Sequence, residues 1–139
     1  MTNAQKKTIE REFYRYRENK QLAGKFLDDF VNKHLVADYS KDRVSGSGVN
    51  GVENGVVSAI PKEAATGARA RKWALVYERT RDKYFCEGKD RLMQLRFQEH
   101  RSVCSICTAL HIERRTYFYW LEQILNTAYI WAQFFEIRF

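Results

Sequence analysis

Apolar side chains recur every three or four residues along most of the chain, which is the spacing of an amphipathic α-helix. One such stripe lies between Ala4 and Tyr39 and comprises Ile9, Phe13, Tyr16, Ala23, Phe26, Phe30 and Val31. A second runs from about Glu63 to Cys86 and comprises Trp73, Val76, Tyr77, Thr80 and Tyr84. Glycine is costly inside a helix, so we expect Gly24 to split or bend the first helix and Gly88 to end the second.

The C-terminal third has the pattern of three further helices. A helix is predicted from Lys89 to about Gln98, with Leu92, Leu95 and Phe97 available for packing. Ser102 favours the start of a short helix over residues 103–110, because its hydroxyl can accept a hydrogen bond from a free amide of the first turn. A turn at 111–113 and a long helix over 114–136 follow. No segment has a strand pattern, so the predicted fold class is all-α.

Glycines divide the chain. Gly46, Gly48, Gly51 and Gly55 fall within ten residues, and the only proline, Pro61, comes soon after them. This composition is typical of a flexible linker. We therefore predict an N-terminal helical arm over residues 1–44, a linker over 45–61 and a C-terminal helical domain over 62–139. The arm is expected to fold separately or to dock loosely.

The charge balance favours a polyanionic partner such as nucleic acid. The chain has 24 Lys and Arg against 17 Asp and Glu, a formal charge of +7. The excess lies upstream, since residues 62–101 hold eleven basic and six acidic side chains, whereas residues 102–139 hold three of each. No apolar run approaches the ~20 residues of a membrane span, and no secretory signal is recognisable. We expect a cytoplasmic protein without membrane contact, with its cysteines as thiols.

Residues 102–125 have the pattern of a helix-turn-helix, a short helix, a tight turn and a second helix that packs back on the first. Cys107 stands where the two helices approach most closely, and a small residue is needed there. Apolar side chains occupy the interior positions of both helices and the turn, namely Ile106, Leu110, Ile112, Tyr117, Trp120, Ile124 and Leu125.

From Leu92 to Leu125 the chain resembles the region-4 helix-turn-helix of bacterial sigma factors. The matching residues are Leu95 to Phe97, Ser102, Ile106, Leu110, Ile112, Arg114 and Thr116. Within that superfamily it is most similar to the RinA/ArpU type of phage late-gene transcription activators, on the pattern C-x-x-x-H-I-x-x-R-T of Cys107 to Thr116. Two positions depart from the pattern. His111 stands where Gly is usual in the turn, and the second helix exposes Phe118 and Tyr119 where polar residues are usual.

This resemblance implies a DNA-binding activator, with double-stranded DNA as its partner and RNA polymerase as a candidate second partner. The second helix would enter the major groove at residues 113–119, where Glu113, Arg114, Arg115, Phe118 and Tyr119 would face the bases. Arg101 and Ser102 would hold the backbone. Because residues 102–139 are neutral, we expect upstream phosphate contacts from Arg69, Arg71 and Lys72.

Other classes of function are less well supported. His100, Cys104, Cys107 and His111 have spacings of 4, 3 and 4 and suggest a zinc site, but four ligands in a row about 16 Å long on one helix cannot surround a tetrahedral ion. The chain contains no phosphate loop, H-E-x-x-H or G-x-S-x-G motif, so we expect no enzyme, no catalytic residue, no metal and no cofactor.

The C-terminal helix is apolar on nearly every side, with a main stripe of Leu121, Ile124, Ala128, Trp131 and Phe135. Tyr129, Ile130 and Phe134 lie off that stripe. Such a helix must be covered, either by the rest of the chain or by a second copy, and the sequence leaves both alternatives open. A second copy would suit a different class, an oligomeric DNA-packaging protein like a small phage terminase subunit, or a protein-interaction module.

Overall fold

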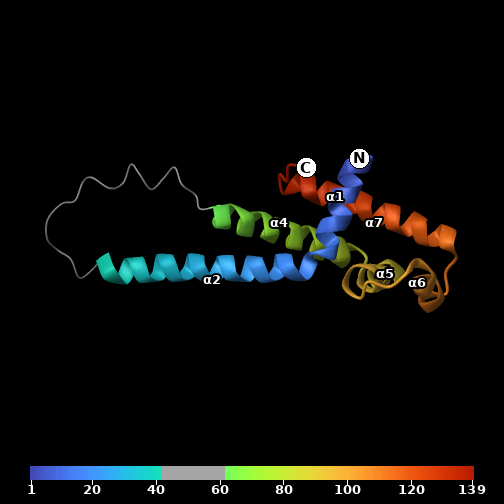
Figure 1. Ribbon diagram of the computed structural model, residues 1–139, viewed down its shortest axis with the longest axis horizontal. Coiled ribbons are helices and arrows are strands. Elements are labelled where there is room, and N and C mark those ends of the chain that lie inside the picture. Colours follow the sequence, from blue (N-terminus) through green and yellow to red (C-terminus); the bar gives the residue numbers. More distant parts are fainter. Residues whose placement is uncertain (42–61) are drawn as a thin grey trace.

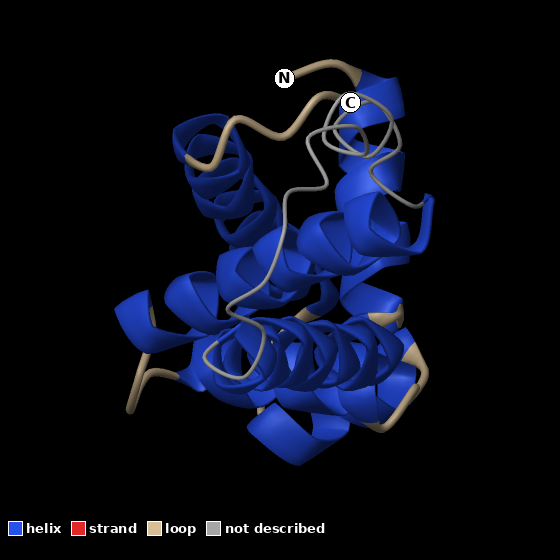
Figure 2. Ribbon diagram, turned by 90° about the vertical axis from the view of Figure 1, so that its left-hand side faces the viewer, coloured by secondary structure: helices blue, strands red, loops and turns tan. Residues whose placement is uncertain are grey.

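The computed structural model describes residues 1–41 and 62–139, and side chains within 1–33 and 65–139. All of the regular structure in these ranges is helical, and Figure 2 draws no strand in them, so the all-α fold class is confirmed for the described residues. The predicted linker over 45–61, with its four glycines, lies outside them.

The helices form an elongated bundle (Figure 1). Helices α2 and α4 run side by side in opposite directions, α7 runs antiparallel to α4, and α1 crosses them. The elements are α1 (Asn3–Tyr14), α2 (Tyr16–Lys41), α4 (Lys62–Lys83), α5 (Gly88–Met93), the π-helical segment η1 (Gln94–Gln98), α6 (Val103–Leu110) and α7 (Arg114–Phe134).

The first predicted helix is broken at Arg15 and not at Gly24. Helix α1 begins in a capping box, in which the Thr2 hydroxyl accepts from the Gln5 amide and the Gln5 side chain accepts from the Thr2 amide. It ends at Tyr14, and α2 starts at Tyr16 in a new direction. The bend lets α1 pack on α7 while α2 follows α4. Gly24 stays within regular helix, so a glycine's cost is tolerated there because tertiary contacts set the direction of the chain.

The expectation of a separate or loosely docked arm is wrong for α1. Ile9 and Phe13 have no exposed surface, and both belong to the same core cluster as the C-terminal helices. The Phe13 ring meets the edges of Tyr77 and Phe97 at centroid distances of 5.0 and 5.2 Å. The predicted stripe continues in the buried Tyr16 and Ala23 and in the half-buried Phe26. Phe30 and Val31 are exposed.

Helix α4 buries the predicted stripe from Trp73 to Thr80, and Tyr84, just after the helix, is buried as well. Its contact with α2 depends on Gly67, where an added Cβ would come within 2.8 Å of the Phe26 Cβ. A larger residue would therefore push α2 and α4 apart.

Gly88 does not end α4, which stops at Lys83, and the chain turns through Cys86 with φ 64°. Gly88 is instead the first residue of α5. A Cβ at this position would lie 2.7 Å from Cη2 of Trp120, so a glycine is needed for the close approach of the Trp120 ring. The tertiary contact explains this glycine better than helix propensity does.

Helix α7 packs its predicted stripe against the core, with Leu121, Ile124 and Ala128 buried and Trp131 and Phe135 half-buried. Ile130 and Phe134, which lie off the stripe, are exposed. The rest of the chain thus packs against the main stripe of α7, whereas Ile130 and Phe134 remain exposed. No helix of the described residues is both long and apolar enough to cross a bilayer.

Candidate nucleic-acid interface

Helix α6 is capped at both ends, and a tight turn joins it to α7. Ser102 precedes α6, and its hydroxyl accepts from the Ser105 amide at 3.3 Å, as the sequence predicts. His111 ends α6 in the left-handed region, with φ 53° and ψ 44°. The Ile112 amide then donates to the Cys107 carbonyl at 3.1 Å. The turn is therefore built with a left-handed histidine where glycine would be unstrained.

The predicted interior positions of the helix pair pack as expected. Ile106, Tyr117 and Ile124 are fully buried, and Leu125 is nearly so. Four further side chains are partly buried against the same cluster, Cys107, Leu110, Ile112 and Trp120. Helices α6 and α7 thus pack their predicted interior faces against one shared core.

An arginine that the sequence does not single out joins this pair to the rest of the molecule. Arg96, in η1, donates to the Tyr117 hydroxyl and forms an ion pair with Glu10 of α1 at 3.3 Å. Its guanidinium also lies within 6 Å of the ring centroids of Tyr14, Phe97 and Tyr117. Burial raises the pKa of the Tyr117 hydroxyl, and the charge of Arg96 offsets part of that rise. Helical spacing does not predict these contacts, because Glu10 lies 86 residues and Tyr117 21 residues from Arg96 in the sequence.

The start of α7 presents the residues that the sequence nominated for base contacts. Glu113 is its N-cap residue without a side-chain cap bond, and both arginines that follow are exposed. The guanidinium of Arg114 lies 5.7 Å from the ring centroid of Phe118, one turn along the helix. Phe118 is half exposed, and Tyr119 is exposed to 62%. The structure therefore brings Glu113, Arg114, Arg115, Phe118 and Tyr119 together on one end of the helix.

Arg101 and Ser102 directly precede α6. The Arg101 side chain is exposed, but its Nε forms an ion pair with Glu99 at 3.0 Å. Glu99 follows the π-helical segment, and the Arg101 amide closes that segment by donating to the Leu95 carbonyl at 3.0 Å. The charge available to a phosphate here is therefore partly neutralised.

The three residues predicted as upstream phosphate contacts lie elsewhere. Arg69 and Lys72 line a cavity of about 250 Å³ together with Glu136, Ile137 and Arg138, which follow α7. Arg71 is exposed on the same stretch of α4. Helix α7 has 21 residues, so at 1.5 Å per residue its two ends are about 30 Å apart. The structure separates the basic stretch of α4 from Arg114 and Arg115 by that length.

Two of the four cysteines and histidines near the turn pack against other side chains. His100 stacks on Tyr14 with 5.4 Å between ring centroids, and Cys107 packs against the core while Cys104 is exposed. Within the described residues, no group of three or more His, Cys, Asp or Glu is arranged to hold a metal ion. The spacing of 4, 3 and 4 is interrupted by the two caps, since His100 precedes α6 and His111 ends it.

Comparison with family models, with curated proteins and with solved structures gives no match for this chain.

Proposed function

We propose that the protein binds double-stranded DNA in a sequence-specific way through α6 and α7 and acts as a transcription activator. The observation that carries this proposal is the exposed start of α7, where Arg114 and Arg115 follow directly on a capped, tightly packed turn. A helix of this kind enters the major groove with its N-terminal residues facing base edges.

The chemistry of this face suits base contacts more than general attraction to phosphate. An arginine can donate two hydrogen bonds to one guanine, and Phe118 and Tyr119 offer apolar surface to a thymine methyl group. The ring of Phe118 under Arg114 limits the conformations of the arginine before it binds. The amides at the start of α7 and the Ser102 hydroxyl would meet the phosphates.

The narrower assignment, an activator of phage or prophage late genes, rests on the similarity of residues 107–116 to RinA/ArpU-type activators. That assignment includes a non-enzymatic protein in the bacterial cytosol and a candidate contact with RNA polymerase. Genome-wide capture of the DNA that the protein occupies tests it. Sites upstream of late lysis or packaging genes are expected, and sites scattered without such genes would contradict it.

The DNA contact itself is tested by substitution at the start of α7. Arg114→Ala should cost about 1–3 kcal/mol on the specific duplex if the arginine contacts a guanine, and much less on random DNA. Arg115→Ala is measured beside it. Titrations at several salt concentrations give the affinity and the number of phosphates neutralised, because each released counterion steepens the salt dependence.

Arg71→Ala is the matched control, because Arg71 is also exposed. The substitution removes one positive charge about one helix length away from Arg114 and Arg115. It should lower the affinity for specific and random duplexes alike, and the salt dependence of binding should fall by the equivalent of at most one phosphate contact. If Arg114→Ala and Arg115→Ala bind the specific duplex as the unmodified protein does, α7 is not the reading helix. The exposed aromatic start of α7 would then fit a protein-binding surface, and an oligomeric packaging or interaction protein would become the leading interpretation.

A further inference from the structure

A cavity of about 340 Å³ opens where α1, α2 and α4 meet, away from the helix-turn-helix. None of its lining residues belongs to 102–125. Small-ligand sites in proteins begin at about 300 Å³, so this space suits a molecule the size of a mononucleotide.

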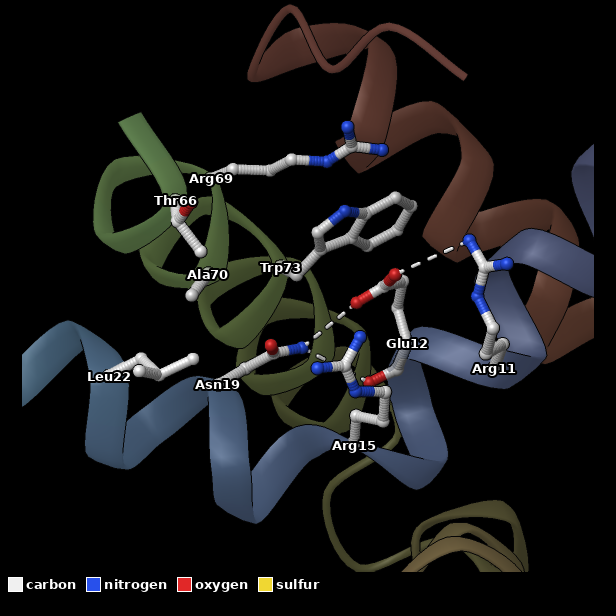
Figure 3. A pocket seen from close by; sticks show the side chains of 9 residues that line it. All are labelled: Arg11, Glu12, Arg15, Asn19, Leu22, Thr66, Arg69, Ala70 and Trp73. Carbon is white, nitrogen blue, oxygen red and sulfur yellow. Dashed lines mark hydrogen bonds and ion pairs between the residues drawn. The ribbon is translucent and has the colours of Figure 1, made fainter. Parts of the chain in front are cut away.

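Three arginines surround the cavity (Figure 3). Arg69 reaches over it from α4, Arg11 lies on one side from α1, and Arg15 lies opposite Arg69 at the break between α1 and α2. Three positive side chains and the carboxylate of Glu12 leave the lining with a formal charge of +2. Such an excess inside a concave surface attracts an anion.

The arginines are not all occupied by internal partners. Arg15 is paired with Glu18 at 2.9 Å, and the guanidinium of Arg11 lies 3.6 Å from the Glu12 carboxylate. Arg69 has no hydrogen bond or ion pair with any residue in the described ranges. Its fork of donors is therefore available to an oxyanion, which it can bind with two parallel hydrogen bonds.

Trp73 gives an independent sign that an acceptor is missing. It lines the cavity and is 2% exposed, yet its indole nitrogen has no hydrogen-bond partner among the described residues. In Figure 3 this nitrogen lies on the edge of the ring turned toward Arg69. A buried donor without an acceptor is costly, and buried Trp usually finds one. A ligand oxygen between Trp73 and Arg69 would satisfy both groups.

Glu12 restricts which anion can bind. Its carboxylate is nearly buried and accepts from the Asn19 side chain at 3.2 Å, so it is held in place on the cavity wall. A fixed carboxylate repels a phosphate placed against it, but it accepts a hydrogen bond from a hydroxyl or amino group. The ligand should therefore carry an oxyanion at one end and such a donor at the other.

We propose that this cavity binds a small phosphate monoester that also carries a hydroxyl or amino donor, such as a mononucleotide. Arg69 and Trp73 donate to the phosphate oxygens, Arg11 and Arg15 supply positive charge, and Glu12 accepts from the donor of the ligand. The binding site lies beyond the DNA contact proposed for α7 and depends on none of its residues.

The test follows the indole N–H signals of the full-length protein by NMR, with ¹⁵N-labelled tryptophan and Trp73→Phe to assign the signal. Adenosine 5′-monophosphate should shift the Trp73 signal with saturation, inorganic phosphate should do so more weakly, and adenosine should not. Arg69→Gln should weaken binding of the monophosphate by about tenfold or more. Arg71→Gln, an equal charge change two residues away and outside the cavity lining, should bind as the unmodified protein does.

Glu12→Gln tests the specificity of the cavity. It should bring the affinities for inorganic phosphate and the monophosphate closer together, because the repulsion of the phosphate is removed. A Trp73 signal that does not respond to the monophosphate would overturn the proposal. So would equal losses in Arg69→Gln and Arg71→Gln, which indicate nonspecific attraction. A response to a random DNA duplex but not to the monophosphate would assign the cavity to backbone phosphate instead and would also overturn it.

Discussion

Two regions of the molecule offer different kinds of surface. Residues 102–139, which include α6 and α7, are neutral in sum, and a tight turn and a packed interior fix where Arg114 and Arg115 stand. Where α1, α2 and α4 meet, three arginines surround a cavity, and farther along α2 the Phe30 side chain is exposed.

The proposed DNA contact and the largest cluster of arginines therefore fall in different regions. The exposed start of α7 carries the proposed base contacts, and the arginine cluster lines the cavity. We propose different ligands for the two regions, a duplex at α7 and a small phosphate at the cavity. Both regions share one core, because α1 packs Phe13 into the common cluster and pairs Glu10 with Arg96 of η1.

The largest expected effect is the loss of Phe13, which is fully buried between Tyr77 and Phe97. Phe13→Ala should reduce the free energy of unfolding by about 3–5 kcal/mol. Denaturant unfolding followed by circular dichroism and by tryptophan fluorescence should give one shared transition at a lower midpoint.

Phe30→Ala is the control for that change, because the same side chain is about half exposed in α2. It should cost no more than about 1 kcal/mol. Two separate transitions, or equal costs for both variants, would mean that the N-terminal helices fold apart from α6 and α7 after all.

A second prediction concerns alkaline pH and the same shared core. Burial raises the pKa of Tyr77 to about 12, partly offset by a hydrogen bond from Gln98. In the unfolded chain a tyrosine releases its proton at a pH of about 10, so the folded state keeps a proton that the unfolded state loses. The contribution of Tyr77 to the free energy of unfolding is fully present below about pH 10. It is lost as the pH rises from about 10 to 12, by about 2–3 kcal/mol in total.

Tyr77→Phe should remove that part of the alkaline loss, although it also loses the hydrogen bond from Gln98 and so begins less stable at neutral pH. The pH dependence of the unfolding midpoint in both proteins measures the difference. Some loss remains, because Tyr16 and Tyr117 also have raised pKa values. Identical alkaline slopes would show that Tyr77 is not desolvated in the folded state.

The smallest expected effect concerns the far end of α7. Phe134 is exposed to 71% and Ile130 is also exposed, so this pair is what a second copy of the chain, the alternative that the sequence leaves open, would cover. If such a dimer forms, Phe134→Ser should raise its dissociation constant by about tenfold, since burying a phenylalanine is worth about 1.5–3 kcal/mol. Gln133→Ser, an exposed polar neighbour, should leave it unchanged. Sedimentation velocity across a concentration range measures both, and a monomer at every concentration would remove the second copy from the interpretation.

Local chemistry in the sequence determined much of this structure. The three-and-four spacing placed the buried face of α4 from Trp73 to Tyr84, and Ser102 marked the start of α6 through its hydroxyl. The interior positions from Ile106 to Leu125 followed from the same periodicity, because residues on one face of a helix meet one partner.

Only the tertiary structure decided how these helices meet. The break at Arg15, the contact of Gly88 with Trp120 and the burial of α1 depend on partners that are distant in sequence, and no spacing within a helix reports them. The same is true of Arg96, which joins Glu10 to Tyr117, and of the cavity between Arg11, Arg69 and Trp73. Periodicity tells which face of a helix is covered, but the identity of the partner depends on packing among all the helices at once.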